Sequence, residues 1–515
     1  MAPSQGRLAT RVAAGILVTR VVGFVRERVF AHYFGNSAVA DAFRAALRIP
    51  NAIRNLLGEG TLSASFIPVY AGMLARGEHE NARRLAGTIA SLLILLAAGA
   101  AALGIVLAPW ITALVAPGFR GPTHDLTVQL VEILFPMFGI TILSAWCLGI
   151  LNTHRRFFIP YAAPAVWNIA QIATLVACGG IWLGARLAVA LAVGALVGSV
   201  LQLAVQLPGT LRLLGRFHWG LDLSTSGVRP VLRAWGPVVI GAGVVQISSI
   251  VDTQLGSLLG TGAVAVLGYA QLVALLPISL FGVSVAAVAL PELSRDAAMT
   301  DLDVLRRRVA DGSRRITYFV VPSAFAFATL GTPIVATLFQ TGRFGAADTE
   351  VAAGVLAAYA VGLLAQASVK LFASGFYALG DTRSPVRIAV FAVALSAALE
   401  ALLMQWLGPA GIALGAAVGA YVNVGLLTVR LERRVGPVVT AAERHPLVAV
   451  LLGATGAAGL AFAGVRALGT APVGITCLVA LAAFAAGYGA VTFTLGHPEA
   501  RRLVAVIRRE GAHRP

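Results

Sequence analysis

The stretch LAGTIASLLILLAAGAAALGIVLA, residues 85–108, contains 24 consecutive residues without a charged side chain. A helix needs roughly 20 apolar residues to cross the hydrocarbon core of a bilayer, so this stretch predicts a transmembrane helix. The whole chain of 515 residues has the same character, because 58% of its residues are apolar and only 12% are charged. This composition excludes a soluble globular protein and a disordered one. It indicates an all-α polytopic membrane protein.

Similar apolar stretches recur along the chain and predict about 14 transmembrane helices. They cover residues 10–31, 39–72, 85–108, 127–151, 161–182, 188–209, 235–258, 264–292, 316–338, 352–377, 388–407, 411–429, 446–465 and 473–494. The second and the eighth stretch are unusually long, and we expect Pro50 and Pro277 to interrupt them.

The basic residues, 38 Arg and the single Lys370, support this count. With the amino terminus in the cytoplasm, 28 of them fall in cytoplasmic loops or termini and only four, Arg120, Arg186, Arg343 and Arg466, fall outside. Cytoplasmic loops of membrane proteins carry such an excess, which predicts that both termini are cytoplasmic. Because the net charge of +17 is spread between apolar segments rather than clustered, we expect no nucleic-acid partner.

Three pairs of segments recur at offsets of 224, 226 and 227 residues. They are PWITALVAPGF (Pro109–Phe119) with PIVATLFQTGRF (Pro333–Phe344), GILNTHRRFFIP (Gly149–Pro160) with GFYALGDTRSP (Gly375–Pro385), and the two proline-interrupted spans. Each offset covers six predicted spans, an even number, so the two copies have the same orientation. The pattern predicts two parallel six-helix repeats plus two carboxyl-terminal helices, an arrangement suited to alternating access.

These repeats define three predicted parts. Residues 1–225 form an amino-terminal six-helix lobe and residues 226–435 a second six-helix lobe. Residues 436–515 add two helices and a basic cytoplasmic tail.

Seven basic residues lie inside predicted spans: Arg20, Arg26, Arg28, Arg44, Arg48, Arg54 and Lys370. Arginine at the centre of a bilayer is costly, so such residues usually face a water-filled cavity. We expect this for Arg20, Arg26 and Arg54, whereas Arg28 and Arg44 suit a cavity and an interfacial position equally well. The corresponding spans of the second half, residues 235–292, contain no basic residue. A cavity with one cationic wall indicates an anionic cargo, such as a phosphate or carboxylate.

Asp41 and Asp252 admit two interpretations each, whereas the residues around Asp381 favour one. Asp41 shares a helix face with Arg44 and Arg48, so it either neutralises these neighbours or serves the cavity. Asp252, in the middle of a span, binds a cation or proton, or pairs with an arginine. Asp381, in ALGDTRSP, is better explained as a cap of a loop or helix start.

The sequence contains no pattern that suggests an enzyme. Its eight histidines show no metal-ligand spacing, and it has no glycine-rich phosphate loop and no nucleophile–base arrangement. We therefore expect neither catalysis nor a bound cofactor.

Several of these segments resemble a known family. RVVGFVRERVFAHYFG (residues 20–35) and DAFRAALRIPNAIRNLLGEGTLSASFIPVY (residues 41–70) are similar to the amino-terminal signature of the MurJ/MviN lipid II flippases. LGILNTHRRFFIPYAAPAVWN (residues 148–168) and FYALGDTRSP (residues 376–385) also resemble family segments. The resemblance covers roughly residues 10–435, and it implies membership of the multidrug/oligosaccharidyl-lipid/polysaccharide exporter superfamily.

The resemblance implies a flippase of the bacterial cytoplasmic (inner) membrane that serves cell wall biogenesis. Its cargo would be undecaprenyl-diphosphate-linked peptidoglycan precursor, with membrane lipids and cell-wall synthesis proteins as further partners. Substrate-binding roles fall by resemblance on Arg20, Arg26, Glu27, Asp41, Arg54 and Glu59. Some members bind sodium, and Asp252 and Asp381 match ligands of that site, so coupling to sodium or to protons stays open. The last two spans would form a groove for the lipid tail.

One position departs from the family pattern. In YAQLVALLP, residues 269–277, Leu272 stands where the family usually has an arginine. Three alternatives to lipid II transport therefore stay open. They are export of another anionic lipid-linked glycan, drug export, and a non-transporting membrane scaffold for cell-wall synthesis. A drug exporter for cations should have acids facing its cavity, and this cavity is mostly basic.

Overall fold

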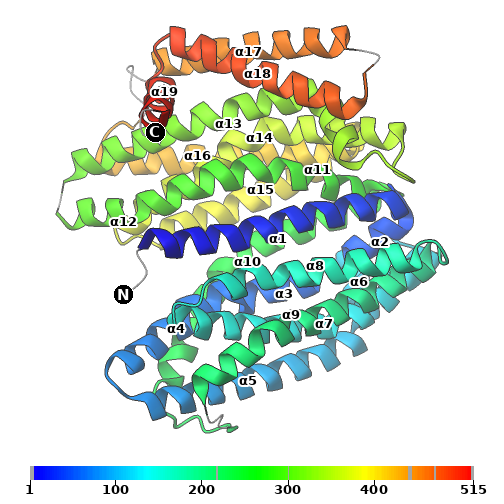
Figure 1. Ribbon diagram of the computed structural model, residues 1–515, viewed down its shortest axis with the longest axis vertical. Helices are drawn as coiled ribbons and strands as arrows, with labels where there is room; N and C mark the ends of the chain where they lie inside the picture. The colour runs from blue at the N-terminus through cyan, green and yellow to red at the C-terminus, as the bar shows by residue number, and fades with distance from the viewer. Residues whose placement is uncertain (1–4, 216–218, 300, 439–443, 469–470, 512–515) are drawn as a thin grey trace. The chain divides into compact units, whose positions relative to one another are not determined.

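The computed structural model describes residues 5–215, 219–299, 301–438, 444–468 and 471–511, without the side chains at some helical positions. These residues form α-helices joined by short loops (Figure 1). Within the described ranges, β-type pairing is limited to one isolated bridge between Thr341 and Phe344. The predicted all-α fold is confirmed.

The chain divides into two compact units. The first contains the residues up to Ala265 together with Thr341–Phe344. Its helices are α1 (Gln5–Phe34), α2 (Ala38–Ala46), α3 (Arg48–Leu57), α4 (Glu59–Ala75), α5 (His79–Val106), α6 (Ala108–Val115), α7 (Gly121–Thr153), α8 (Phe158–Cys178), α9 (Ala185–Leu214) and α10 (Val228–Leu258).

The second unit contains Val266–Gln340 and the residues from Gly345 onward. Its elements are most of α11 (Ala263–Pro277), the π-helix η1 (Ile278–Val283), α12 (Ser284–Ala298), α13 (Leu302–Phe339), α14 (Ala346–Ala378), α15 (Arg383–Leu407), α16 (Pro409–Val435), α17 (Arg444–Ala467), α18 (Val473–Thr494) and α19 (Pro498–Gly511). Helix α10 packs on α3 and α4 and therefore belongs to the first unit. The two units thus differ from the lobes of residues 1–225 and 226–435 that the repeat predicts, and those lobes stay a prediction.

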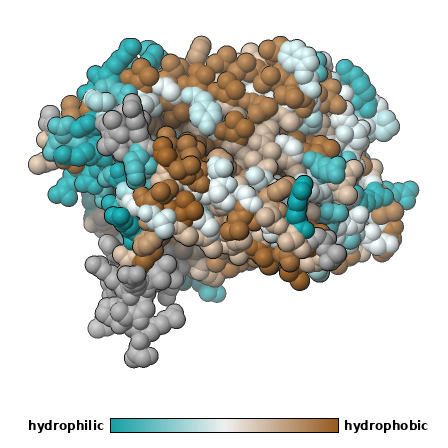
Figure 2. Space-filling model, turned by 90° about the horizontal axis from the view of Figure 1, so that it is seen from above, coloured by the Kyte–Doolittle hydropathy of each residue, from teal (hydrophilic) through white to brown (hydrophobic). Residues whose placement is uncertain are grey.

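Eleven helical segments in the described residues are long and apolar enough to cross a membrane. The three predicted spans outside this set are residues 10–31, 39–72 and 235–258, which correspond to α1, to α2–α4 and to α10. The protein is thus a multi-pass membrane protein, and the count of 14 spans stays a prediction. Figure 2 shows broad areas of exposed apolar side chains, in brown. Val106 and Trp110 are examples, with 73% and 75% of their surface exposed. Such surface is suited to contact with lipid.

The long second segment is broken twice, at Leu47 and at Gly58. Pro50 lies in the first turn of α3, where its missing N–H would have no helical acceptor, so it starts the helix rather than kinking it. At Pro277 the eighth segment changes from α-helix to the π-helix η1 and then continues as α12, so the proline alters the helical hydrogen-bonding pattern rather than interrupting the helix as predicted.

The internal repeat recurs in the helix bounds. Helices α7 and α14 each have 33 residues, and their first residues are 225 positions apart. Helices α8 and α15 also start 225 positions apart, and α9 and α16 start 224 apart. Even backbone angles repeat: Gly184 before α9 has φ 59° and ψ −130°, and Gly408 before α16 has φ 56° and ψ −137°.

The loop 341–344 packs against the end of α1. The Arg343 amide donates a hydrogen bond to the His32 carbonyl at 2.8 Å, and His32 Nδ1 lies 2.9 Å from the Thr341 hydroxyl. A Cβ on Gly342 would lie 2.3 Å from the His32 carbonyl oxygen, so only glycine allows this approach. These contacts explain why a short loop groups with the first unit.

The additional helices α17 and α18 run side by side and are attached to α13 (Figure 1). The Tyr488 hydroxyl donates to the Tyr318 carbonyl at 2.6 Å, and the Tyr318 hydroxyl lies 3.3 Å from that of Thr492. The His497 ring stacks on Tyr318 with centroids 4.6 Å apart. This pair of helices is therefore an integral part of the second unit.

Candidate functional site

A carboxylate on α1 is held between two arginines. Glu27 forms ion pairs with Arg26, its neighbour on the helix, and with Arg44 of α2, at 2.7 Å from the latter. Glu27 is only 8% exposed, so its charge needs these partners. Two guanidinium groups against one carboxylate leave the cluster with a net positive charge.

Aromatic rings orient both arginines. The Arg26 guanidinium lies 5.0 Å from the centroid of Trp167 on α8, and that of Arg44 lies 5.1 Å from the centroid of Phe30. The indole N–H of Trp167 donates to the Ala195 carbonyl of α9 at 3.0 Å, which fixes the ring. Cation–π contact adds to the stability of the charged cluster.

A polar cavity of about 200 Å³ lies between α3 and α10. It is lined by Arg48, Asn51, Ala52, Arg54, Asn55, Gln246, Ser249 and Ile250. The lining contains two arginines, several amide and hydroxyl groups, and no acidic residue. We call it the α3–α10 cavity.

Hydroxyl groups of α10 position one of the two arginines. Arg48 Nε donates to the Thr253 hydroxyl at 2.7 Å, and Arg48 Nη1 donates to the Ser249 hydroxyl at 2.8 Å. Seven residues further along the chain, Asn55 donates to the side-chain oxygen of Gln246 at 3.3 Å. Because a guanidinium group presents several donors in one plane, it can keep these bonds and still bind an anion.

The breaks that flank α3 place its arginines. They make α3 a separate helix of 10 residues that lies against α10. At the second break, a Cβ on Gly58 would lie 2.3 Å from the Arg54 carbonyl oxygen, so glycine is required there. The local sequence thus places Arg48 and Arg54 on one short helix beside the hydroxyl groups of α10.

Asp41 accepts hydrogen bonds from the backbone, and Arg44 also acts on its carboxylate electrostatically. Its carboxylate accepts hydrogen bonds from the amides of Gly262 and Ala265, the latter at 2.7 Å, at the start of α11. A carboxylate is favoured there because the first amides of a helix lack helical acceptors. Its role in substrate binding stays a prediction.

The other predicted substrate-binding residues are not all together. Arg26 and Glu27 share the charged cluster, and Arg54 lines the α3–α10 cavity. Arg20 is exposed on α1, although it lies seven residues before the buried Glu27. The side chain of Glu59 lies outside the described residues.

The two predicted sodium ligands have different surroundings. Asp252 is buried on α10, at 8% exposed. Asp381 follows α14, where one oxygen accepts the amides of Arg383 and Ser384 and the other pairs with Arg434 at 2.7 Å. These hydrogen bonds, chiefly those with Ser384, lower the pKa of Asp381 to about 2. The described residues hold no group of three or more His, Cys, Asp or Glu side chains placed for a metal ion, and the sodium site stays a prediction.

Sequence reasoning missed the neutral partners of the arginines. Trp167, Ser249 and Thr253 position Arg26 and Arg48 but come from segments far away in the chain. Gln246 and Ser249 do carry a signal, because polar residues in a predicted span often face a cavity.

Comparison with known proteins gives consistent results. The family model described as Lipid II flippase MurJ matches residues 30–483. The Lipid II flippase MurJ of Burkholderia cenocepacia is 34% identical over 439 residues, which cover 83% of this chain and 84% of that protein.

Solved structures share the fold. The structure titled "Lipid II flippase MurJ, inward closed conformation" has a TM-score of 0.79 at 22% identity, covering 96% of this chain and 99% of that one. An inward-facing multidrug resistance MATE family transporter of the MOP superfamily has a TM-score of 0.67 at 16% identity, covering 83% of this chain and 98% of that one. The match over most of the sequence and the shared fold lead to one conclusion: this chain belongs to the Lipid II flippase MurJ family.

Proposed function

We propose that this protein moves lipid II, the undecaprenyl-diphosphate-linked peptidoglycan precursor, from the inner to the outer leaflet of the bacterial cytoplasmic membrane. Family membership supports the cargo. The observation that carries the mechanism is the α3–α10 cavity, which contains Arg48 and Arg54 and no acidic residue in its lining.

The charge of the cargo explains the need for such a cavity. A diphosphate cannot cross hydrocarbon by itself, because its charges would lose their water. Guanidinium groups replace that water with charge-assisted hydrogen bonds to the phosphate oxygens. The prenyl tail needs no such replacement and can stay in lipid while the headgroup crosses by alternating access between two repeats.

The proposed orientation places both termini in the cytoplasm. The excess of basic residues in the loops on that side supports it. An inside-negative potential then favours outward movement of an anion by about 2.3 kcal/mol per charge per 100 mV. Outward movement therefore needs no ATP hydrolysis, and a sodium ion or proton resets the empty carrier.

Complementation tests this function. In bacteria depleted of their own lipid II flippase, the wild-type chain should restore growth and prevent lipid II accumulation. Arg54→Ala should abolish rescue because it removes a cation from the cavity. Arg233→Ala, a change of an exposed arginine on α10, is the matched control and should rescue fully. Equal rescue by both variants would contradict transport through this cavity and would favour the scaffold function.

Leu272 favours a second candidate, transport of a different anionic lipid-linked glycan. This residue is half-buried on α11 and supplies no cation where the family usually has arginine. If the wild-type chain reaches the membrane but fails to rescue, Leu272→Arg separates the two functions. Rescue by this variant would assign the failure to the missing charge, and continued failure would indicate another cargo.

A further inference from the structure

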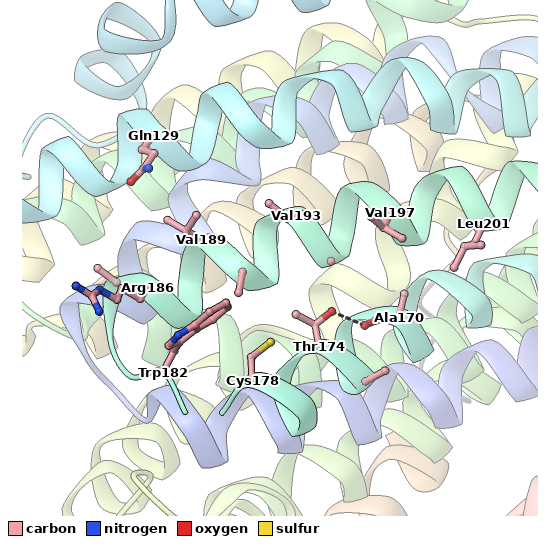
Figure 3. A pocket seen from close by; sticks show the side chains of 14 residues that line it. Gln129, Ala170, Thr174, Cys178, Trp182, Arg186, Val189, Val193, Val197 and Leu201 are labelled. Carbon is pink, nitrogen blue, oxygen red and sulfur yellow. Dashed lines mark hydrogen bonds between the residues drawn. The ribbon is translucent and has the colours of Figure 1, made fainter. Parts of the chain in front are cut away.

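A second, much larger cavity lies between α8 and α9 in the first unit (Figure 3). Its volume is about 980 Å³. The lining residues are Gln129 of α7, then Ala170, Ala173, Thr174, Cys178, Trp182, Ala185, Arg186, Val189, Ala190, Val193, Gly194, Val197 and Leu201. It shares no residue with the α3–α10 cavity, and we call it the α8–α9 groove.

Small residues create this groove. A Cβ on Gly194 would lie 2.1 Å from the Thr174 hydroxyl oxygen, so α8 and α9 approach closely at this point. Ala170, Ala173 and Ala190 continue the lining, and their methyl groups leave space between the helices. Larger apolar side chains of α9 form one wall, as Figure 3 shows for Val189, Val193 and Val197.

The groove is open and apolar along most of its length. Val193, Val197 and Leu201 are 46%, 49% and 44% exposed. From Arg186 to Leu201 the helix rises by about 22 Å, because each residue adds about 1.5 Å. One leaflet contributes about 15 Å to the hydrocarbon core, so the groove is long enough for an acyl chain.

One end of the groove is polar and cationic. Arg186, Trp182 and Gln129 lie at this end, and Leu201 lies at the other (Figure 3). Arg186 is exposed, and among the described residues it has no ion pair or side-chain hydrogen bond. Arg186 occupies the first turn of α9, where the helix dipole disfavours a cation. A contribution to helix stability therefore does not explain why an arginine is present at this position. Tryptophan is typical of the membrane interface, where lipid headgroups begin.

We infer that the α8–α9 groove binds one phospholipid with an anionic headgroup. An acyl chain lies along Val193, Val197 and Leu201, and the phosphate contacts Arg186. The charge at one end and the apolar lining beyond it match the two parts of such a lipid. A phospholipid is the occupant because the groove opens along helices that are long and apolar enough to span the bilayer.

Native mass spectrometry of the delipidated full-length protein tests the inference, with phosphatidylglycerol and phosphatidylcholine of identical chains as probes. Arg186→Gln should weaken phosphatidylglycerol binding about fivefold, since one basic residue contributes about that factor to binding of an anionic lipid. It should weaken phosphatidylcholine binding less, because the choline cation offsets the charge of the phosphate in that headgroup. Arg466→Gln, at another predicted extracytoplasmic position, should change neither.

A matched pair of tryptophan variants tests the groove itself. Val197→Trp should fill the groove and weaken binding of both lipids. Val200→Trp is the control, because Val200 is equally exposed at 49% on the same helix but does not line the groove. Equal effects of these two variants would overturn the groove. An unchanged preference for phosphatidylglycerol in Arg186→Gln would overturn the headgroup contact. Displacement of phosphatidylglycerol by equimolar undecaprenyl diphosphate would reassign the groove to prenyl lipid.

Discussion

The Glu27 carboxylate of α1 lies 2.7 Å from the Arg44 guanidinium of α2, and it also pairs with Arg26. The side chains of Glu27 and Arg44 are only 11% and 16% exposed, so water screens this ion pair weakly. The pair links α1 to the short helix that precedes α3. The ion pairs of this charged cluster therefore depend on the Glu27 carboxylate.

Glu27→Gln should lower the free energy of unfolding by about 3 kcal/mol, because it removes the buried carboxylate that pairs with the guanidinium groups of Arg26 and Arg44. Chemical unfolding in detergent measures the change. A double-mutant cycle with Arg44→Gln should give a coupling energy of about 1–3 kcal/mol. Glu80→Gln is the control, since Glu80 pairs with Arg84 at an exposed site and should lose less than about 1 kcal/mol. Equal effects at both sites would contradict the buried pair.

Arg48→Ala and Arg54→Ala should each weaken binding of undecaprenyl diphosphate to the purified protein by roughly 10- to 100-fold. The reason is the loss of a hydrogen bond to a charged group, worth about 1.5–3 kcal/mol. Ser249→Ala with Thr253→Ala should have a smaller effect, because Arg48 remains but is no longer oriented. Binding by isothermal titration calorimetry measures these losses. If the double hydroxyl variant binds as weakly as Arg48→Ala, the α10 hydroxyl groups contact the ligand directly.

Stability should depend on pH through His497. This residue is buried at 1% exposed, and burial, followed by repulsion from Arg314 and His445, lowers its pKa from 6.5 to about 4. The folded state then binds fewer protons than the unfolded state between these values. The contribution of His497 to the free energy of unfolding is therefore fully present above about pH 6.5. It is lost as the pH falls toward 4, which lowers the free energy of unfolding by up to about 3 kcal/mol.

Unfolding measured from pH 7 to pH 4 tests this prediction. His497→Gln should reduce the decline, because it removes the group that must be protonated. His79→Gln, a change of an exposed histidine, should retain it. An unchanged slope in His497→Gln would show that another group is responsible.

The repeat makes a prediction about two turns that are 225 positions apart. Gly380 has φ 75° and open space within 4 Å of where a Cβ would lie, whereas Arg155 holds φ 59° as a non-glycine residue. Gly380→Ala should destabilise the protein by about 1 kcal/mol, because the left-handed backbone disfavours a Cβ. Arg155→Gly should be neutral or stabilise by a few tenths of a kcal/mol, since relief of strain is partly offset by the entropy of glycine. Thermal unfolding of both variants measures the difference. Destabilisation by Arg155→Gly would mean that this side chain stabilises the turn.

Hydropathy predicted most helices because lipid contact demands long apolar runs. It failed in residues 39–72, where the chain forms three helices. Proline suggested a break at Pro50, but the breaks lie at Leu47 and Gly58. A proline in the first turn of a helix removes no helical hydrogen bond. The sequence shows where the proline is but not where the helix begins, so it cannot distinguish a proline that starts a helix from one that interrupts it.

The candidate site was predictable only in its charged residues. Arg26, Glu27 and Arg54 are conspicuous because charges are rare inside spans. Their neutral partners are not, since a hydroxyl or a ring such as Thr253 or Trp167 is common in any span. Arg20 and Glu27 are seven residues, or about two helical turns, apart and therefore share a helix face, yet Arg20 is exposed and Glu27 is buried. Burial depends on which helix lies beside each turn, and tertiary packing determines that.

The contacts between His32 and the loop 341–344 also set an order for biogenesis. The residues joined by the side-chain hydrogen bond are 309 positions apart. A ribosome delivers the chain from its amino terminus, so α1 enters the membrane long before Thr341 is synthesised. Such distant contacts form late in assembly. Until then the end of α1 lacks its final neighbours, and the nascent protein passes through a partly assembled state that insertion factors and membrane proteases can engage.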